Sequence, residues 1–224
     1  MVNGDTNDLC IELESYIRDD NYKESECKKF LTYAIGILVD FTTSRIIDQE
    51  SEYRGHSGDS DYLIVCARVD VAGQECIEAY VWEAKAPQCF LFEPDTKARV
   101  RPTKEFISAE NQLLHYFDEL KGSSQFREEF NITSPDNVKL GGIVIGCRDR
   151  LVKPNDYSVS KAKKLSKRAF EIRMRHLYKS SGIEVKTWDD ILAYLKGGEQ
   201  PQRRDVQQRS VSITGTENVV TSND

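Results

Sequence analysis

Apolar residues recur along the chain with two periods, and each period predicts one type of element. Spacings of three and four residues predict helices over residues 24–47, 104–121, 160–180 and 188–195. Alternating or continuous apolar runs predict strands over residues 61–69, 77–85, 140–146 and 183–186. Gly73 marks a turn between the first two strands, so they are expected to pair as a hairpin. Residues 53–60 and 88–104 are expected to be loops.

The order of these elements predicts an α/β fold in which a mixed central sheet is flanked by helices. A chain of 224 residues is long enough for one domain with a substantial core. Residues 1–22 are polar and are expected to be a leader, and residues 23–196 are expected to form the domain. Residues 197–224 are rich in Gln, Arg, Ser, Thr and Asn, a composition that predicts a disordered tail.

Composition narrows the classes of protein to consider. The net charge of −6 argues against indiscriminate tight binding to nucleic acid, although it is compatible with a nuclease whose acidic metal site is neutralised by bound cations. No apolar stretch is long enough to span a bilayer and the N-terminus lacks a signal-peptide pattern, so we expect a cytoplasmic protein without a membrane partner. Six cysteines without a Cys-x-x-Cys spacing, and only three histidines, argue against structural zinc.

Candidate chemistry gathers at the predicted hairpin. Glu83 and Lys85 are two residues apart on a strand, so their side chains point to the same face. Asp61 begins the neighbouring strand, and the hairpin can bring it close to Glu83. On its own a Glu-x-Lys pair is most often a solvated cross-strand pair. Its place at the end of an apolar run, after a strand that an aspartate opens, favours an active site.

Two close carboxylates make an oxygen site suited to Mg²⁺, and Mn²⁺ is expected to substitute for it. The predicted metal ligands are Asp61, Glu83 and the carbonyl oxygen of Ala84. Asp59 is an alternative first ligand, and Glu24 or Glu26 could add a further carboxylate. The glutamates could equally serve to stabilise the start of their helix. Lys85 would orient the nucleophilic water and stabilise the charge that develops on the phosphate.

The helix after this hairpin offers accessory groups. Gln112 and Tyr116 are four residues apart and share one helical face. Gln112 is expected to hydrogen-bond a phosphate oxygen or Lys85 and is counted with the catalytic set. Tyr116 is expected to brace the site or touch the DNA backbone.

Two basic segments are candidate contacts for nucleic-acid phosphates. The predicted helix over residues 160–180 carries Lys164, Lys167 and Arg168, and the predicted loop before residue 104 carries Arg99 and Arg101. An ordinary solvated basic face is the competing interpretation for both segments.

The order of these motifs resembles the Shedu-type nuclease domain, which is found in bacterial anti-phage defence proteins with a PD-(D/E)xK fold. The resemblance covers roughly residues 24–195 and rests on Asp61, on Glu83-Ala84-Lys85-Ala86-Pro87, and on residues 90–92, 109–116, 142–148 and 185–192. It implies Mg²⁺-dependent cleavage of DNA by a homo-oligomer, with Asp61, Glu83 and Lys85 as the catalytic set. A restriction- or repair-type nuclease on the same core is an alternative, as is an inactive nuclease fold that only binds nucleic acid.

Overall fold

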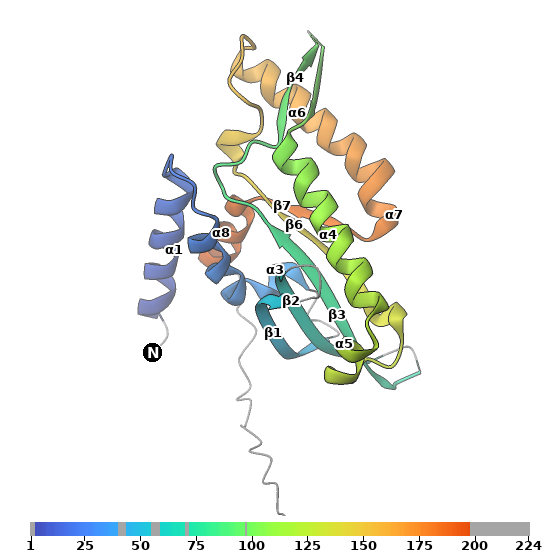
Figure 1. The fold of residues 1–224 in the computed structure, drawn as a ribbon. Helices are drawn as coiled ribbons and strands as arrows, with labels where there is room; N and C mark the ends of the chain where they lie inside the picture. Colours follow the sequence, from blue (N-terminus) through green and yellow to red (C-terminus); the bar gives the residue numbers. More distant parts are fainter. Residues whose placement is uncertain (1–2, 40–43, 55–58, 70–71, 97, 198–224) are drawn as a thin grey trace, which may run out of the picture.

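The centre of the molecule is a five-stranded mixed sheet with strand order β1-β2-β3-β6-β7 (Figure 1). The computed structural model describes residues 3–39, 44–54, 59–69, 72–96 and 98–197. The sheet consists of β1 (Ser44–Arg54), β2 (Asp59–Val69), β3 (Glu75–Ala84), β6 (Val138–Val144) and β7 (Glu184–Lys186). The first three strands pair antiparallel, whereas β6 pairs with β3 and β7 with β6 in parallel. The predicted α/β class with a mixed sheet is confirmed.

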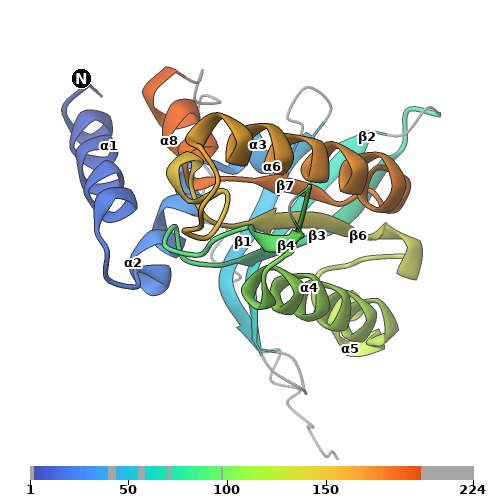
Figure 2. The same cartoon turned by 90° about the horizontal axis from the view of Figure 1, so that it is seen from above.

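Helices cover both faces of this sheet (Figure 2). One face carries α4 (Lys104–Gly122) and α5 (Ser124–Glu129), and the other carries α3 (Ile35–Leu38) and α8 (Trp188–Gly197). The remaining helices are α1 (Asn3–Arg18), α2 (Glu24–Lys28), α6 (Val159–Arg173) and α7 (Lys179–Ser181). A π-helical turn, Met174–Tyr178, joins α6 to α7. No helix in the described ranges has the length and apolar character needed to cross a membrane.

Alternation along the strands divides the core into two layers, because successive strand residues point to opposite faces. Leu63 and Val81 face α4, where Phe106 and Leu113 are fully buried. The intervening residues of the same strands pack on the opposite face, against α1, α2 and α8; they include Tyr62, Ile64 and Trp82. Both faces of the hairpin are therefore buried, as its nearly continuous apolar sequence requires.

Local capping explains where two of the predicted helices begin. The Thr103 hydroxyl accepts a hydrogen bond from the backbone N–H of Phe106, which is the standard cap for the first turn of α4. At α8, the Thr187 backbone N–H and hydroxyl both donate to Asp190 Oδ2 at 2.8 Å. The Asp190 N–H in turn donates to Thr187 Oγ1 at 3.4 Å. These reciprocal bonds form a capping box in which Thr187 is the N-cap.

The helix predicted over residues 24–47 is wrong in its second half. The described chain forms α2, a 3₁₀ turn (Lys29–Tyr33) and α3, and then the strand β1 begins at Ser44. β1 is an edge strand with mostly polar residues, so its sequence carries little apolar alternation. It forms because its backbone pairs along the length of β2, with a register shift between Ile46 and Asp48.

The loop predicted over residues 88–104 is also wrong in part. It contains a second, two-stranded sheet made of β4 (Phe92–Thr96) and β5 (Arg99–Pro102). Pro94 and Pro102 lie in these strands, and prolines argue against a strand when only sequence is considered. The pair avoids that penalty because it is a short hairpin outside the main sheet.

The N-terminal segment takes part in the main core. Cys10, Leu13 and Ile17 of α1 are buried in the same cluster as Trp188 and Leu195 of α8. The residues expected as a polar leader therefore include a helix that packs on the domain. The tail predicted over 197–224 lies, apart from Gly197, outside the described residues. The six cysteines are free, and all except Cys76 are buried.

Candidate active site

The register of the hairpin places Asp61 opposite Glu83. Tyr62 pairs with Trp82 and Leu63 with Val81, so Asp61 and Glu83 are the next opposed positions in the same register. Residues directly opposite in an antiparallel pair project to the same face, with their Cβ atoms close together. The Ala84 N–H donates to Asp61 Oδ2 at 2.9 Å, which fixes the aspartate against the end of β3.

Glu83 is the most buried ionisable group of this cluster. Its exposed fraction is 1%, and its Oε2 atom is buried without a hydrogen-bond partner. Burial, with the negative charge of Asp61 added to it, raises the pKa of the Glu83 carboxyl to about 8. A buried carboxylate oxygen without a partner is costly to a fold, and a carboxyl whose pKa is raised by burial and a neighbouring charge is typical of functional sites.

Lys85 is held by both its side chain and its backbone. Its Nζ atom lies 2.6 Å from Glu83 Oε1, and its carbonyl oxygen accepts a hydrogen bond from Trp188 Nε1 at 2.7 Å. Burial acts to lower the pKa of the Lys85 ammonium, but the charge and hydrogen bond of Glu83, together with the charges of Glu24 and Asp61, raise this pKa overall. The fully buried Trp188 therefore links α8 to the residue predicted to assist the nucleophile.

A second lysine, which no motif in the sequence singled out, enters the site from α2. Lys28 Nζ forms a short hydrogen-bonded ion pair with Asp61 Oδ1 and lies 3.5 Å from Glu24 Oε1. Glu24 Oε1 is in turn 4.0 Å from Lys85 Nζ, and the Tyr22 hydroxyl donates to Glu24 Oε2. The signal in the sequence was weak, because a Glu24–Lys28 spacing of four residues is typical of any surface helix.

The carboxylate oxygens of Asp61 and Glu83 could supply only part of the ligands of a divalent cation. Glu83 offers an oxygen without a partner, and Asp61 lies opposite it. Within the part of the chain that the structure describes, no group of three or more His, Cys, Asp or Glu side chains is arranged to hold a metal ion. Mg²⁺ keeps several waters and needs only one or two carboxylates, so the pair suffices for Mg²⁺ but not for a fully protein-ligated metal.

The alternative carboxylates are placed differently. Glu24 reaches the cluster around Lys85, whereas Glu26 lies 3.3 Å from Lys23 Nζ on the same segment. Asp59 begins β2 and pairs with Arg54 through the backbone, but its side chain lies outside the described residues. The carbonyl of Ala84 stays a predicted ligand.

Gln112 does not join this cluster in the contacts of the described residues. It lines a groove of about 480 Å³ on α4 together with Lys104, Ile107, Ser108, Asn111 and His115. Its Oε1 atom is buried and has no hydrogen-bond partner. Tyr116 packs against the core on the α4 side, with its ring centroid 5.8 Å from that of His115. The accessory roles of Gln112 and Tyr116 stay predictions.

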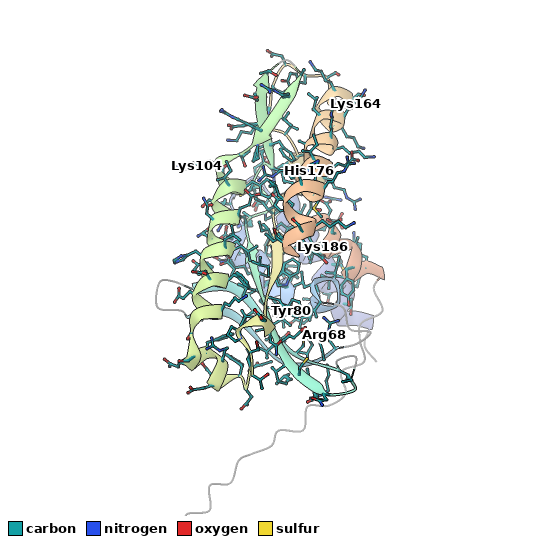
Figure 3. The ribbon with its side chains drawn as sticks, turned by 90° about the vertical axis from the view of Figure 1, so that its right-hand side faces the viewer. Arg68, Tyr80, Lys104, Lys164, His176 and Lys186 are labelled. Atoms are coloured by element: carbon teal, nitrogen blue, oxygen red, sulfur yellow. The ribbon has the colours of Figure 1, made fainter. Side chains whose placement is uncertain are left out.

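The two predicted basic segments lie next to one another, although about 60 residues separate them in sequence. α6 packs along β5, and the Tyr157 hydroxyl donates to the Thr96 carbonyl beside them. Lys164 and Arg168 are exposed on α6, and Figure 3 labels Lys164 near the end of this helix. The other three basic residues face nearby carboxylates: Arg99 with Asp95 at 3.3 Å, Arg101 with Glu93 at 2.8 Å and Lys167 with Glu171 at 3.9 Å.

Comparison with known proteins adds no relative. No family model matches the chain, and no curated protein matches it.

Proposed function

We propose that this chain is a Mg²⁺-dependent DNA endonuclease that hydrolyses phosphodiester bonds and acts in bacterial anti-phage defence. The observation that carries the enzymatic part is the convergence of Asp61, Glu83 and Lys85 at the end of the β2–β3 hairpin, with Glu83 Oε2 buried and without a partner. The defence role and a homo-oligomeric state rest on the resemblance of the motifs to the Shedu-type domain.

Each residue has a role that follows from its position. Asp61 and Glu83 would hold Mg²⁺, which when bound acidifies a water molecule and stabilises charge on a phosphate oxygen. Lys85 would orient that water and neutralise negative charge on the scissile phosphate. The Trp188 indole holds the Lys85 backbone, and Glu83 Oε1, 2.6 Å from Lys85 Nζ, positions the ammonium.

Exposed basic residues supply the simplest contact with DNA. Lys164, Lys167 and Arg168 on α6, with Arg99 and Arg101 on the adjacent β5, would face backbone phosphates. Such contacts favour binding without sequence preference and make it sensitive to salt.

The decisive experiment measures cleavage of linear and supercoiled DNA with Mg²⁺, Mn²⁺ or EDTA. We expect metal-dependent cleavage that falls at least about a hundredfold in Lys85→Ala and in Glu83→Ala, because each removes a charge at the reacting phosphate or its metal. Matched controls are Lys29→Ala, an exposed lysine on the 3₁₀ turn, and Glu75→Ala, an exposed carboxylate on the same strand as Glu83. Cleavage that both site variants retain would rule out this site.

A second candidate is an inactive nuclease fold that binds nucleic acid. The ion pair between Lys28 and Asp61 favours it, because an ammonium already neutralises one predicted metal ligand. This alternative predicts DNA binding without cleavage under any metal, and binding that Glu83→Ala leaves unchanged. A restriction- or repair-type nuclease would cleave in the same assay and would differ only in its substrate and trigger.

A further inference from the structure

Lys28 occupies the side of Asp61 that a metal ion would need. One carboxylate oxygen of Asp61, Oδ2, accepts the Ala84 N–H at 2.9 Å, and the other, Oδ1, is bound by the Lys28 ammonium. Both oxygens therefore have a partner in the described structure. Lys28 is itself well enclosed, with 13% of its side chain exposed, and Glu24 flanks it on the second side.

Lys85 pairs with only one oxygen of its own partner, the Glu83 carboxylate. It pairs with Glu83 Oε1 and leaves the buried Glu83 Oε2 without a hydrogen-bond partner. If Asp61 and Glu83 hold a divalent ion, Glu83 would offer its unpartnered oxygen. On Asp61 the ion would have to share or replace the ammonium of Lys28, and two cations on one carboxylate in a buried site repel strongly.

We propose that Lys28 is a built-in competitor for the divalent cation: it pairs with Asp61 in the metal-free chain and weakens metal binding at the Asp61–Glu83 pair. The inference rests on the proposed function, because it assumes that this pair is the metal site. It assigns Lys28 a regulatory role that keeps the site closed at low metal concentration. Lys28 acts indirectly, because it contacts the carboxylates of Asp61 and Glu24 and does not itself bind the ion.

The test is Mn²⁺ binding measured by isothermal titration calorimetry on the full chain. The variants are Lys28→Gln, which removes the charge and keeps a hydrogen-bond donor, and Lys28→Met, which removes both. We expect each to bind Mn²⁺ at least about tenfold more tightly than wild type, because a buried like charge is removed. Lys28→Arg keeps the charge and is expected to bind as weakly as wild type. Lys29→Met, at the next and more exposed lysine, is the matched control and is expected to leave affinity unchanged.

A second readout guards against poor folding. Removal of the Lys28 charge leaves the negative charge of Asp61 less well neutralised, so both neutral variants are expected to unfold at a lower temperature than wild type in EDTA. Added Mn²⁺ is expected to raise their unfolding temperature by more than it raises that of wild type. Adding Glu83→Gln to Lys28→Gln is expected to abolish the gain, which locates the ion.

The possible outcomes separate this inference from the proposed function. Binding by wild type with no gain in either neutral variant overturns the role of Lys28 and leaves the metal site intact. Absence of Mn²⁺ binding in wild type and in both neutral variants overturns the metal site, and with it both proposals. Binding that only the neutral variants show supports the inference in its strongest form.

Discussion

Two partly buried ionic clusters of the described residues differ in whether their hydrogen bonds are complete. In the cluster between α4 and the π-helical turn, Glu110 Oε1 accepts from both Arg173 and the Tyr178 hydroxyl, and Arg173 Nε donates to the same hydroxyl at 2.8 Å. The guanidinium also lies 5.5 Å from the ring centroids of Phe106 and Tyr178. This cluster is closed on itself and joins two helices.

The cluster at the end of the β2–β3 hairpin is not closed. Lys28 pairs with Asp61 and Lys85 with Glu83, but Glu83 Oε2 stays buried without a partner and the pKa of Glu83 is raised. A purely structural ion cluster gains stability by satisfying every buried group. The difference suggests that the first cluster serves stability and that the second retains an unmet bonding capacity for a ligand.

The largest expected stability effect comes from breaking the closed cluster. Arg173→Met leaves Glu110 and Tyr178 without their charged partner, so we expect the free energy of unfolding to fall by about 3 kcal/mol. Urea denaturation measures it, with Arg175→Met, at an exposed arginine two residues further on, as the control. Cleavage per folded molecule is expected to stay within a few-fold of wild type. A loss of stability no larger than that of the control would remove the contrast between the clusters.

The cluster at the end of the β2–β3 hairpin, which we call the open cluster, is expected to make the free energy of unfolding depend on pH. The pKa of Glu83 is raised from its usual 4.5 to about 8, so the folded state keeps a proton that the unfolded chain releases between these values. Wild type therefore loses stability as pH rises through this window, whereas Glu83→Gln cannot ionise there. In EDTA, we expect Glu83→Gln to gain about 2 kcal/mol or more over wild type between about pH 5 and about pH 8.

Denaturant titrations at the two pH values check this expectation. Glu75→Gln, at an exposed carboxylate of the same strand, gives the reference for a general effect of charge. A gain in Glu83→Gln that does not depend on pH would mean that the buried carboxyl is ionised throughout and is better satisfied than its geometry indicates.

The smallest effect is expected at the backbone anchor of the open cluster. Trp188→Phe removes the indole N–H that binds the Lys85 carbonyl, while Trp82→Phe removes an indole N–H that is buried without a partner. Both substitutions reduce the volume of a fully buried side chain in a similar way. Trp188→Phe should therefore cost about 1 kcal/mol more than Trp82→Phe, the net value of one hydrogen bond. Equal costs would show that Lys85 does not depend on this anchor.

The sequence was sufficient where structure depends on near neighbours. Apolar periodicity correctly predicted the β2–β3 hairpin, α4 and β6, and the capping box at Thr187 joins residues only three positions apart. The hairpin also accounts for the meeting of Asp61 with Glu83, since opposed positions in a two-stranded register follow from the turn. These features are determined by local spacing, which a single chain displays directly.

Tertiary structure decided the rest. β1 forms because β2 offers it an edge, not because its polar residues favour a strand, and residues 44–47 at its start were predicted to be helical. Lys28 reaches Asp61 across 33 positions, and Trp188 reaches Lys85 across 103. Pairings of this kind depend on how the layers pack on the sheet, and no periodicity in the chain encodes them. The sequence alone determined the hairpin and the positions of Asp61, Glu83 and Lys85 on it. The ion pair of Lys28 with Asp61 and the bond of Trp188 to Lys85 became visible only in the folded molecule.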